Sequence, residues 1–231
     1  IVQNTSGPKE ANDFWSRAEL NLLMALIHYV VNLRDANGNL LPIEQRGLGD
    51  VYRMIATESI EEINRRLAAL PPEHPAKYPH GLFLKAKENL WGNIVIGLGN
   101  RLAVFQSRLV DKITRNHDVD LLLPGKRPCV YFVIISAQDS AYRFLSSLFF
   151  SLALPQLSNF ARLQCPGGRL PVLTNFCLDE YCNIGYLDGV ADSLNSIRGF
   201  NMSAQIVVQS LSQWQEKYPG KEWENQLATF D

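Results

Sequence analysis

The sequence predicts an all-α half followed by an α/β half that contains part of a parallel sheet. Residues 1–120 hold 14 basic and 14 acidic side chains, whereas residues 121–231 hold 8 and 9. The spacing of apolar residues changes near the same place, from a helical period to short apolar runs that alternate with helical stretches. We therefore expect an all-α domain over 1–118 and part of a parallel α/β domain over 119–231.

The first half is expected to be a helical bundle. A helix should run from Phe14 to about Arg34 with Asp13 as its N-cap, and its apolar residues cover so many sides that it should be the central helix. Further helices are expected at about 43–55, 58–69, 81–90 and 93–115, with a proline-rich loop over 71–80.

The second half alternates between strand and helix patterns. Residues 130–135 form a continuous apolar run of the kind found in strands buried on both faces. Similar runs at 171–178 and 204–208 are separated by helical patterns at 138–157 and 188–198. This order indicates a parallel sheet with crossover helices.

Composition excludes several classes of protein. The chain has 231 residues, is 46% hydrophobic and carries a net charge of −1, so it is not disordered and has no global field for nucleic acid or membranes. Its longest apolar stretches fall short of a membrane span, and it starts at Ile1, so we expect a soluble piece of a longer protein. The four cysteines lack CxxC spacing, and no histidines accompany them at zinc spacing, so we expect reduced, buried thiols.

The strongest chemical signal is the acidic pair Asp179-Glu180 at the end of a predicted strand. Ligands of parallel sheets bind beyond the carboxyl ends of the strands. There, an Asp can hold Mg²⁺, directly or through water, and a Glu can orient or deprotonate an attacking water. Gln209, at the end of the next strand, can sense the same phosphate or water. The alternative is an acidic pair that merely opens a surface turn.

Three other features carry weaker signals. No Gly-x4-Gly-Lys-Ser/Thr loop occurs, so nucleotide binding by this piece alone should be poor. Arg198 follows the helix before the last strand and is either an arginine finger for a neighbouring subunit or a surface residue at a helix C-terminus.

The spacing of a basic row along the 93–115 helix fits either a track for a phosphate backbone or a solvated flank beside an apolar seam. The row consists of Arg101, Arg108, Lys112 and Arg115, and the seam of Leu98, Leu102, Phe105, Leu109 and Ile113.

The order of motifs along the chain resembles that of the TraG/VirD4-type coupling proteins of type IV secretion. The pattern is the apolar run in LPVLTNFCLDE, an Asn-Ile-Gly turn, a helix, an Arg and Asn, and the strand AQIVV before Gln-Ser and a Gln-rich helix. Upstream, CVYFVIIS, NRLAVFQSRLVDKIT and DFWSRAELNLLMALIHYV extend the resemblance over nearly the whole chain.

This resemblance implies a conjugative motor ATPase in which an all-α domain is inserted into a RecA-like nucleotide-binding domain, of which residues 119–231 would form a part. In such a protein Asp179 and Glu180 correspond to the Walker B pair, Gln209 to the strand-end glutamine and Arg198 to a trans-acting arginine. The resemblance further implies ATP and Mg²⁺ as cofactors of the full-length protein, and a homo-hexamer at the cytoplasmic face of the cell membrane. Its expected partners are the relaxase or relaxosome, single-stranded DNA and components of the secretion channel. The alternatives are a non-enzymatic module that binds cargo or DNA, and an unrelated small-molecule α/β enzyme.

Overall fold

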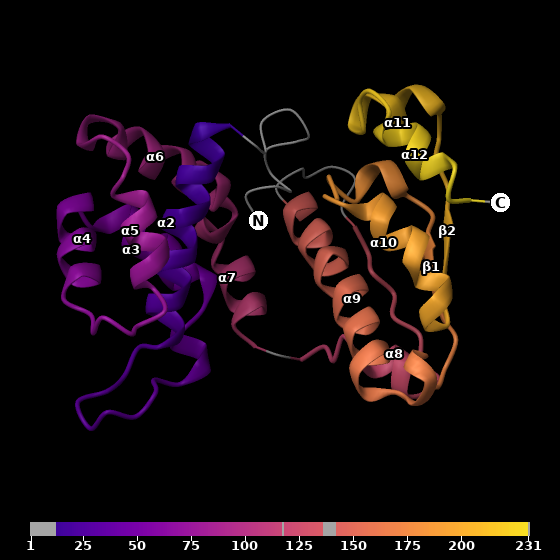
Figure 1. The fold of residues 1–231 in the computed structure, drawn as a ribbon, viewed down its shortest axis with the longest axis horizontal. Coiled ribbons are helices and arrows are strands. Elements are labelled where there is room, and N and C mark those ends of the chain that lie inside the picture. The colour runs from indigo at the N-terminus through magenta and orange to yellow at the C-terminus, as the bar shows by residue number, and fades with distance from the viewer. Residues whose placement is uncertain (1–12, 117, 136–141, 231) are drawn as a thin grey trace. The chain divides into compact units, whose positions relative to one another are not determined.

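A computed structural model describes residues 13–116, 118–135 and 142–230, and this part of the chain divides into two compact units after Asp118 (Figure 1). The chain is mostly helical and has a small parallel sheet in the second unit. The helical region followed by an α/β region that the sequence predicts fits this arrangement.

The regular secondary structure among the described residues of the first unit is helical, apart from one isolated bridge between Arg34 and Leu40. The elements are α2 (Phe14–Val31), η1 (Ile43–Gln45), α3 (Leu48–Thr57), α4 (Ile60–Ala68), α5 (Lys77–Phe83), α6 (Glu88–Arg101), η2 (Ala103–Gln106) and α7 (Arg108–Arg115).

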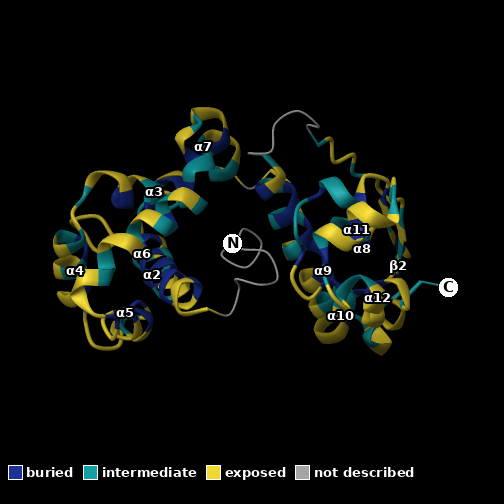
Figure 2. Cartoon of the chain, turned by 90° about the horizontal axis from the view of Figure 1, so that it is seen from above, coloured by how far each residue is buried: buried dark blue, intermediate teal, exposed yellow. Residues whose placement is uncertain are grey.

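Helix α2 is the central helix of this unit, as its apolar pattern predicts. It packs against α3, α5 and α6. Figure 2 shows buried residues along α2, and Leu22 and Leu26 are fully buried. The Asp13 carboxylate caps its first turn by accepting the Ser16 N–H at 2.7 Å. The N-cap inferred from the sequence is therefore confirmed.

Several boundaries in the first unit differ from expectation, and the helix expected over 81–90 is divided between the end of α5 at Phe83 and the start of α6 at Glu88. The helix expected over 93–115 ends at Arg101, and α7 starts afresh after Ser107, whose hydroxyl accepts the Val110 N–H at 3.4 Å. Serine is a preferred N-cap, and an N-cap begins a new helix wherever packing allows one. The expected 71–80 loop already contains the start of α5, because the first turn of a helix tolerates Pro79.

The second unit is a layer of helices on a pair of parallel strands. Its elements are α8 (Leu123–Lys126), α9 (Arg143–Gln164), η4 (Pro166–Gly168), β1 (Thr174–Leu178), η5 (Tyr181–Asn183), α10 (Val190–Ile197), η6 (Arg198–Phe200), β2 (Met202–Ile206), α11 (Leu211–Lys217) and α12 (Glu222–Leu227). β1 pairs with β2 in parallel, with Thr174 opposite Met202 and Leu178 opposite Ile206. Residues of α9, α10 and α11 complete one apolar core with this pair.

The strand expected at 130–135 does not form. Phe132 and Ile134 are 87% and 94% exposed, and the segment lies along a cavity of about 940 Å³ that β1 and α9 also line. An apolar run becomes a strand only if a neighbour offers its backbone groups, and local sequence cannot show that neighbour. The helix expected at 138–157 is displaced to 143–164, and residues 136–141 lie outside the described part of the chain.

The remaining differences are smaller. Both strands are shorter or earlier than expected, at 174–178 and 202–206. All four cysteines are free thiols, but Cys129 and Cys177 are exposed, so the expectation of buried thiols is wrong for these two.

Among the described helices, α9 alone is long and apolar enough to cross a membrane. The core helix of a globular domain has the same length and composition, and α9 contributes Leu154, Leu157 and Ala161 to the core of its unit.

A buried ion pair joins α2 to α6 and explains a glycine in the Gly97-Leu98-Gly99 stretch. The Arg101 Nε lies 2.5 Å from Oε2 of Glu19, and the two side chains are only 15% and 7% exposed. A Cβ placed on Gly97 would lie 2.0 Å from the other oxygen of Glu19. Gly97 therefore makes room for the carboxylate one turn before its partner arginine.

We predict that Gly97→Ala destabilises the protein by about 1–3 kcal/mol, because the new methyl group must displace a buried, paired carboxylate. Gly92→Ala in the same helix is the matched control, since a Cβ there meets nothing within 4 Å. This control should stabilise the protein by about 0.5–1 kcal/mol through helix propensity. Urea denaturation followed by circular dichroism measures both, and equal effects of the two substitutions would contradict the packing argument.

Candidate functional site

The acidic pair lies at the carboxyl edge of the parallel strands. Asp179 and Glu180 follow β1 directly, and both side chains are exposed. Backbone pairing continues past the strands, since the Val207 N–H donates to the Leu178 carbonyl at 2.9 Å and the Tyr181 N–H donates to the Val207 carbonyl at 3.3 Å. Backbone hydrogen bonds on either side of the two acids thus fix their main chain, while their carboxylates face solvent.

Two amides converge on one oxygen of Glu180. The Gln209 Nε2 donates to Oε2 at 3.4 Å, and the Asn183 Nδ2 donates to the same atom at 2.5 Å. The structure thus brings Gln209, from beyond β2, to Glu180, from beyond β1. The role of Asn183 was missed in the sequence, where the residue was assigned only to a turn. The signal was an amide three residues after a carboxylate at the start of a tight turn.

The turn after Glu180 is anchored in the core. Tyr181 is fully buried, and its hydroxyl donates to Oε1 of Gln226 at 2.9 Å, the atom that also accepts the Trp214 indole N–H at 2.8 Å. Gly185 has a φ of +97°, and a Cβ there would lie 2.9 Å from the Arg143 carbonyl at the start of α9. The Asn-Ile-Gly turn therefore has a packing requirement for glycine.

Lys217, the last residue of α11, also contacts this turn. Its ammonium donates to the carbonyls of Tyr181 and Cys182 at 2.9 and 3.0 Å and lies 5.5–5.6 Å from the ring centres of Tyr181 and Tyr218. Burial lowers the pKa of Lys217 to about 8, the Cys182 thiol opposes this shift, and the positive charge of Arg143 adds to it.

Arg198 lies at the opposite edge of the strand pair. It starts η6, and the neighbouring Phe200 carbonyl accepts the Leu170 N–H at 3.0 Å, close to the beginning of β1. The five residues of β1 span about 16 Å, so Arg198 does not join Asp179 and Glu180 within one chain. A role as an arginine finger is therefore compatible only with the site of another subunit.

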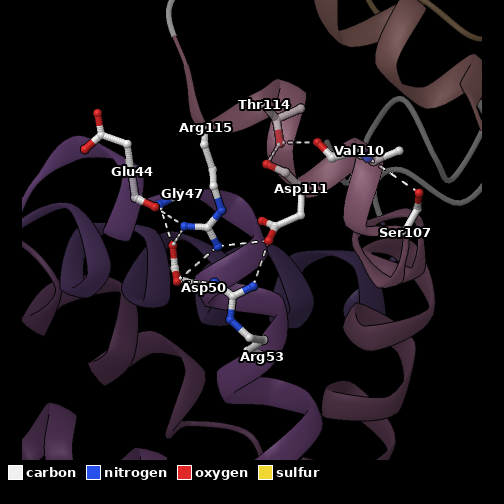
Figure 3. Close-up of polar contacts among 9 residues, drawn as sticks. All are labelled: Glu44, Gly47, Asp50, Arg53, Ser107, Val110, Asp111, Thr114 and Arg115. Atoms are coloured by element: carbon white, nitrogen blue, oxygen red, sulfur yellow. Dashed lines mark hydrogen bonds and ion pairs between the residues drawn. The ribbon is translucent and has the colours of Figure 1, made fainter.

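The basic row is not a single surface. Arg101 forms the buried pair with Glu19 described above, and Arg115 is held by two acids (Figure 3). The Arg115 guanidinium lies 3.0 Å from Asp111 and 3.3 Å from Asp50, and it also donates to the Glu44 carbonyl. Arg53 pairs with the same two carboxylates. Two cations of the row are therefore already matched by internal partners.

The other two cations lie on the exposed side of α7. Arg108 and Lys112 are one turn apart and both exposed. The expected apolar seam divides in the same way, because Leu98, Leu102 and Phe105 are buried whereas Leu109 and Ile113 are 60% and 53% exposed. Because the helix restarts at Ser107, the face of α7 no longer continues the face of α6.

Comparison with known proteins bears on this geometry. A family model described as type IV secretory system conjugative DNA transfer matches residues 1–229. The chain belongs to this family. The match spans both units, so this conjugative DNA transfer protein includes the helical unit as well as the strand pair with its acidic edge. The resemblance to coupling proteins is thereby confirmed. No curated protein and no solved structure matched the chain.

The lowered pKa of Lys217 predicts a pH dependence of stability. The unfolded lysine keeps its proton up to about pH 10.5, whereas the folded one loses it near pH 8. Between these values the unfolded state binds more protons, so the free energy of unfolding increases as pH rises. From pH 7 to pH 9 this gain is about 1 kcal/mol. Lys217→Met should remove it, and urea titrations followed by tryptophan fluorescence at both pH values measure the difference. Parallel pH profiles of the two proteins would contradict the assignment.

Proposed function

We propose that this chain is part of an ATP-driven motor for conjugative DNA transfer. The observation that carries the proposal is the meeting of Glu180 and Gln209 at the carboxyl edge of parallel strands, beside the exposed carboxylate of Asp179. This is the edge at which open parallel sheets bind ligands. The family match gives the biological setting, and it disfavours the unrelated small-molecule enzyme.

The donor set fits ATP with Mg²⁺. Magnesium commonly uses one or two carboxylates, several waters and the phosphates of its nucleotide, and an exposed Asp179 at a strand end supplies such a carboxylate. The ion would neutralise charge on the phosphates. In this proposal, Glu180 orients and deprotonates the attacking water, and Gln209 holds the glutamate toward the phosphate side. In the same proposal, the loop that cradles the phosphates belongs to a part of the protein outside residues 1–231.

The wider assembly is part of the same proposal. A homo-hexameric ring at the cytoplasmic face of the cell membrane would place Arg198 of one subunit at the nucleotide of its neighbour. This agrees with its position at the opposite edge from Asp179 within one chain. The motor would pass relaxase-bound single-stranded DNA to the secretion channel.

We predict that Glu180→Gln in the full-length protein lowers ATP turnover by about 100-fold or more, because it removes the general base. Binding of ATP should persist, since the amide keeps the size and the contacts of the side chain. Glu216→Gln is the matched control: Glu216 is exposed on α11 and carries the same change of charge. A phosphate-release assay measures turnover. Full turnover by the Glu180→Gln protein would refute the motor assignment.

A second function is favoured by the exposed side of α7. Arg108 and Lys112 together with the exposed Leu109 and Ile113 form a surface on which cations alternate with apolar groups. Such a surface can contact a nucleic-acid backbone or a protein cargo. In this alternative the helical unit is a binding module that needs no ATP.

We predict that reversing both charges, Arg108→Glu with Lys112→Glu, weakens binding of single-stranded DNA. The slope of log Kd against log salt should fall by about 1.4, because each lost phosphate contact contributes about 0.7. Lys85→Glu with Lys87→Glu is the control, because it changes the net charge equally at exposed sites away from α7. Fluorescence anisotropy over a salt series gives the slopes. An unchanged affinity at low salt would assign Arg108 and Lys112 to a solvated face.

A further inference from the structure

Helix α11 connects the two sides of the acidic site. It begins two residues after Gln209, which contacts the carboxylate of Glu180, and it ends at Lys217, which contacts the backbone just after Glu180. The segment from Gln209 to Lys217 therefore holds the Glu180 turn at two points, one on the side chain and one on the main chain.

The Lys217 ammonium donates to backbone carbonyls of a short turn that cannot bond them internally. The carbonyls of Tyr181 and Cys182 belong to η5, whose three residues are too few to satisfy their own carbonyl groups by helical bonding. One ammonium with its three donors serves both carbonyls and lies against two aromatic rings. Asn183, the last residue of the same turn, then donates to Glu180 at 2.5 Å.

Lys217 carries its charge in a largely desolvated position. Burial disfavours the charged form of Lys217, which is why its pKa lies well below the ordinary range of lysine. Groups whose pKa is strongly shifted by burial and specific partners cluster at functional sites. Here the partners of Lys217 are carbonyls of the turn that carries Asn183.

We propose that Lys217 is a positioning residue for Glu180, acting through the Tyr181–Asn183 turn and the amide of Asn183. The inference rests on the proposed function of Glu180 as the base of ATP hydrolysis. Lys217 touches neither nucleotide nor water in this scheme. It sets the position of the turn, and the turn sets the direction of the carboxylate.

The test compares Lys217→Met, Lys217→Gln and Lys217→Arg in the full-length protein. We expect kcat for ATP hydrolysis to fall about 10–100-fold in the first two, because displacement of a catalytic group by about 1 Å costs this much. KM for ATP should stay within twofold, because Lys217 does not contact the nucleotide. Lys217→Arg keeps the charge and the donors and should recover most of kcat. Lys221→Met, at an exposed lysine before α12, is the control and should leave kcat unchanged.

The outcomes separate this inference from the proposed function. Loss of turnover in Glu180→Gln with wild-type kcat in a folded Lys217→Met or Lys217→Gln protein would overturn the positioning role alone. Full turnover in Glu180→Gln would overturn both. If neither neutral variant folds, as judged by circular dichroism and melting temperature, Lys217 acts on stability only and the positioning role is overturned. A KM for ATP that rises while kcat stays constant would overturn it as well.

Discussion

The parallel pairing of β1 with β2 is the constraint on which the acidic site depends. Its register puts Leu178 opposite Ile206, so that the residues after both strands emerge at one edge and the side chains of Glu180 and Gln209 meet there. A slip of one residue would move every side chain of a strand to its other face. The contact between these two side chains is therefore a direct consequence of strand register.

The surroundings of Glu180 combine exposure with rigidity. The carboxylates of Asp179 and Glu180 face solvent, whereas Tyr181, Ile184 and Leu187 of the following turn are buried. The C-terminal helices complete this support, because Gln226 accepts from Tyr181 and the Tyr218 hydroxyl accepts the Leu187 N–H at 3.2 Å. A catalytic side chain needs this combination, since it must be reachable by the reactant and held in one position.

Local chemistry determined which features could be predicted from sequence. The Asp13 cap, the central place of α2 and the strand that ends just before Asp179 follow from short-range patterns, and the structure has all three. Features that depend on partners far along the chain could not be predicted. Arg101 and Arg115 look like surface cations until Glu19 and Asp50 are brought to them, and residues 130–135 look like a strand although no strand in the described part of the chain pairs with them. Asn183 was missed because a turn residue gives no sign of which neighbour its amide contacts.

The most direct measurement is a cryo-electron microscopy structure of the full-length protein with a non-hydrolysable ATP analogue and Mg²⁺. Our account predicts the terminal phosphate beyond the ends of β1 and β2, with the Asp179 carboxylate beside the metal ion and Glu180 facing the position of the attacking water. A nucleotide bound elsewhere, or an acidic edge covered by packed side chains of another part of the protein, would contradict it.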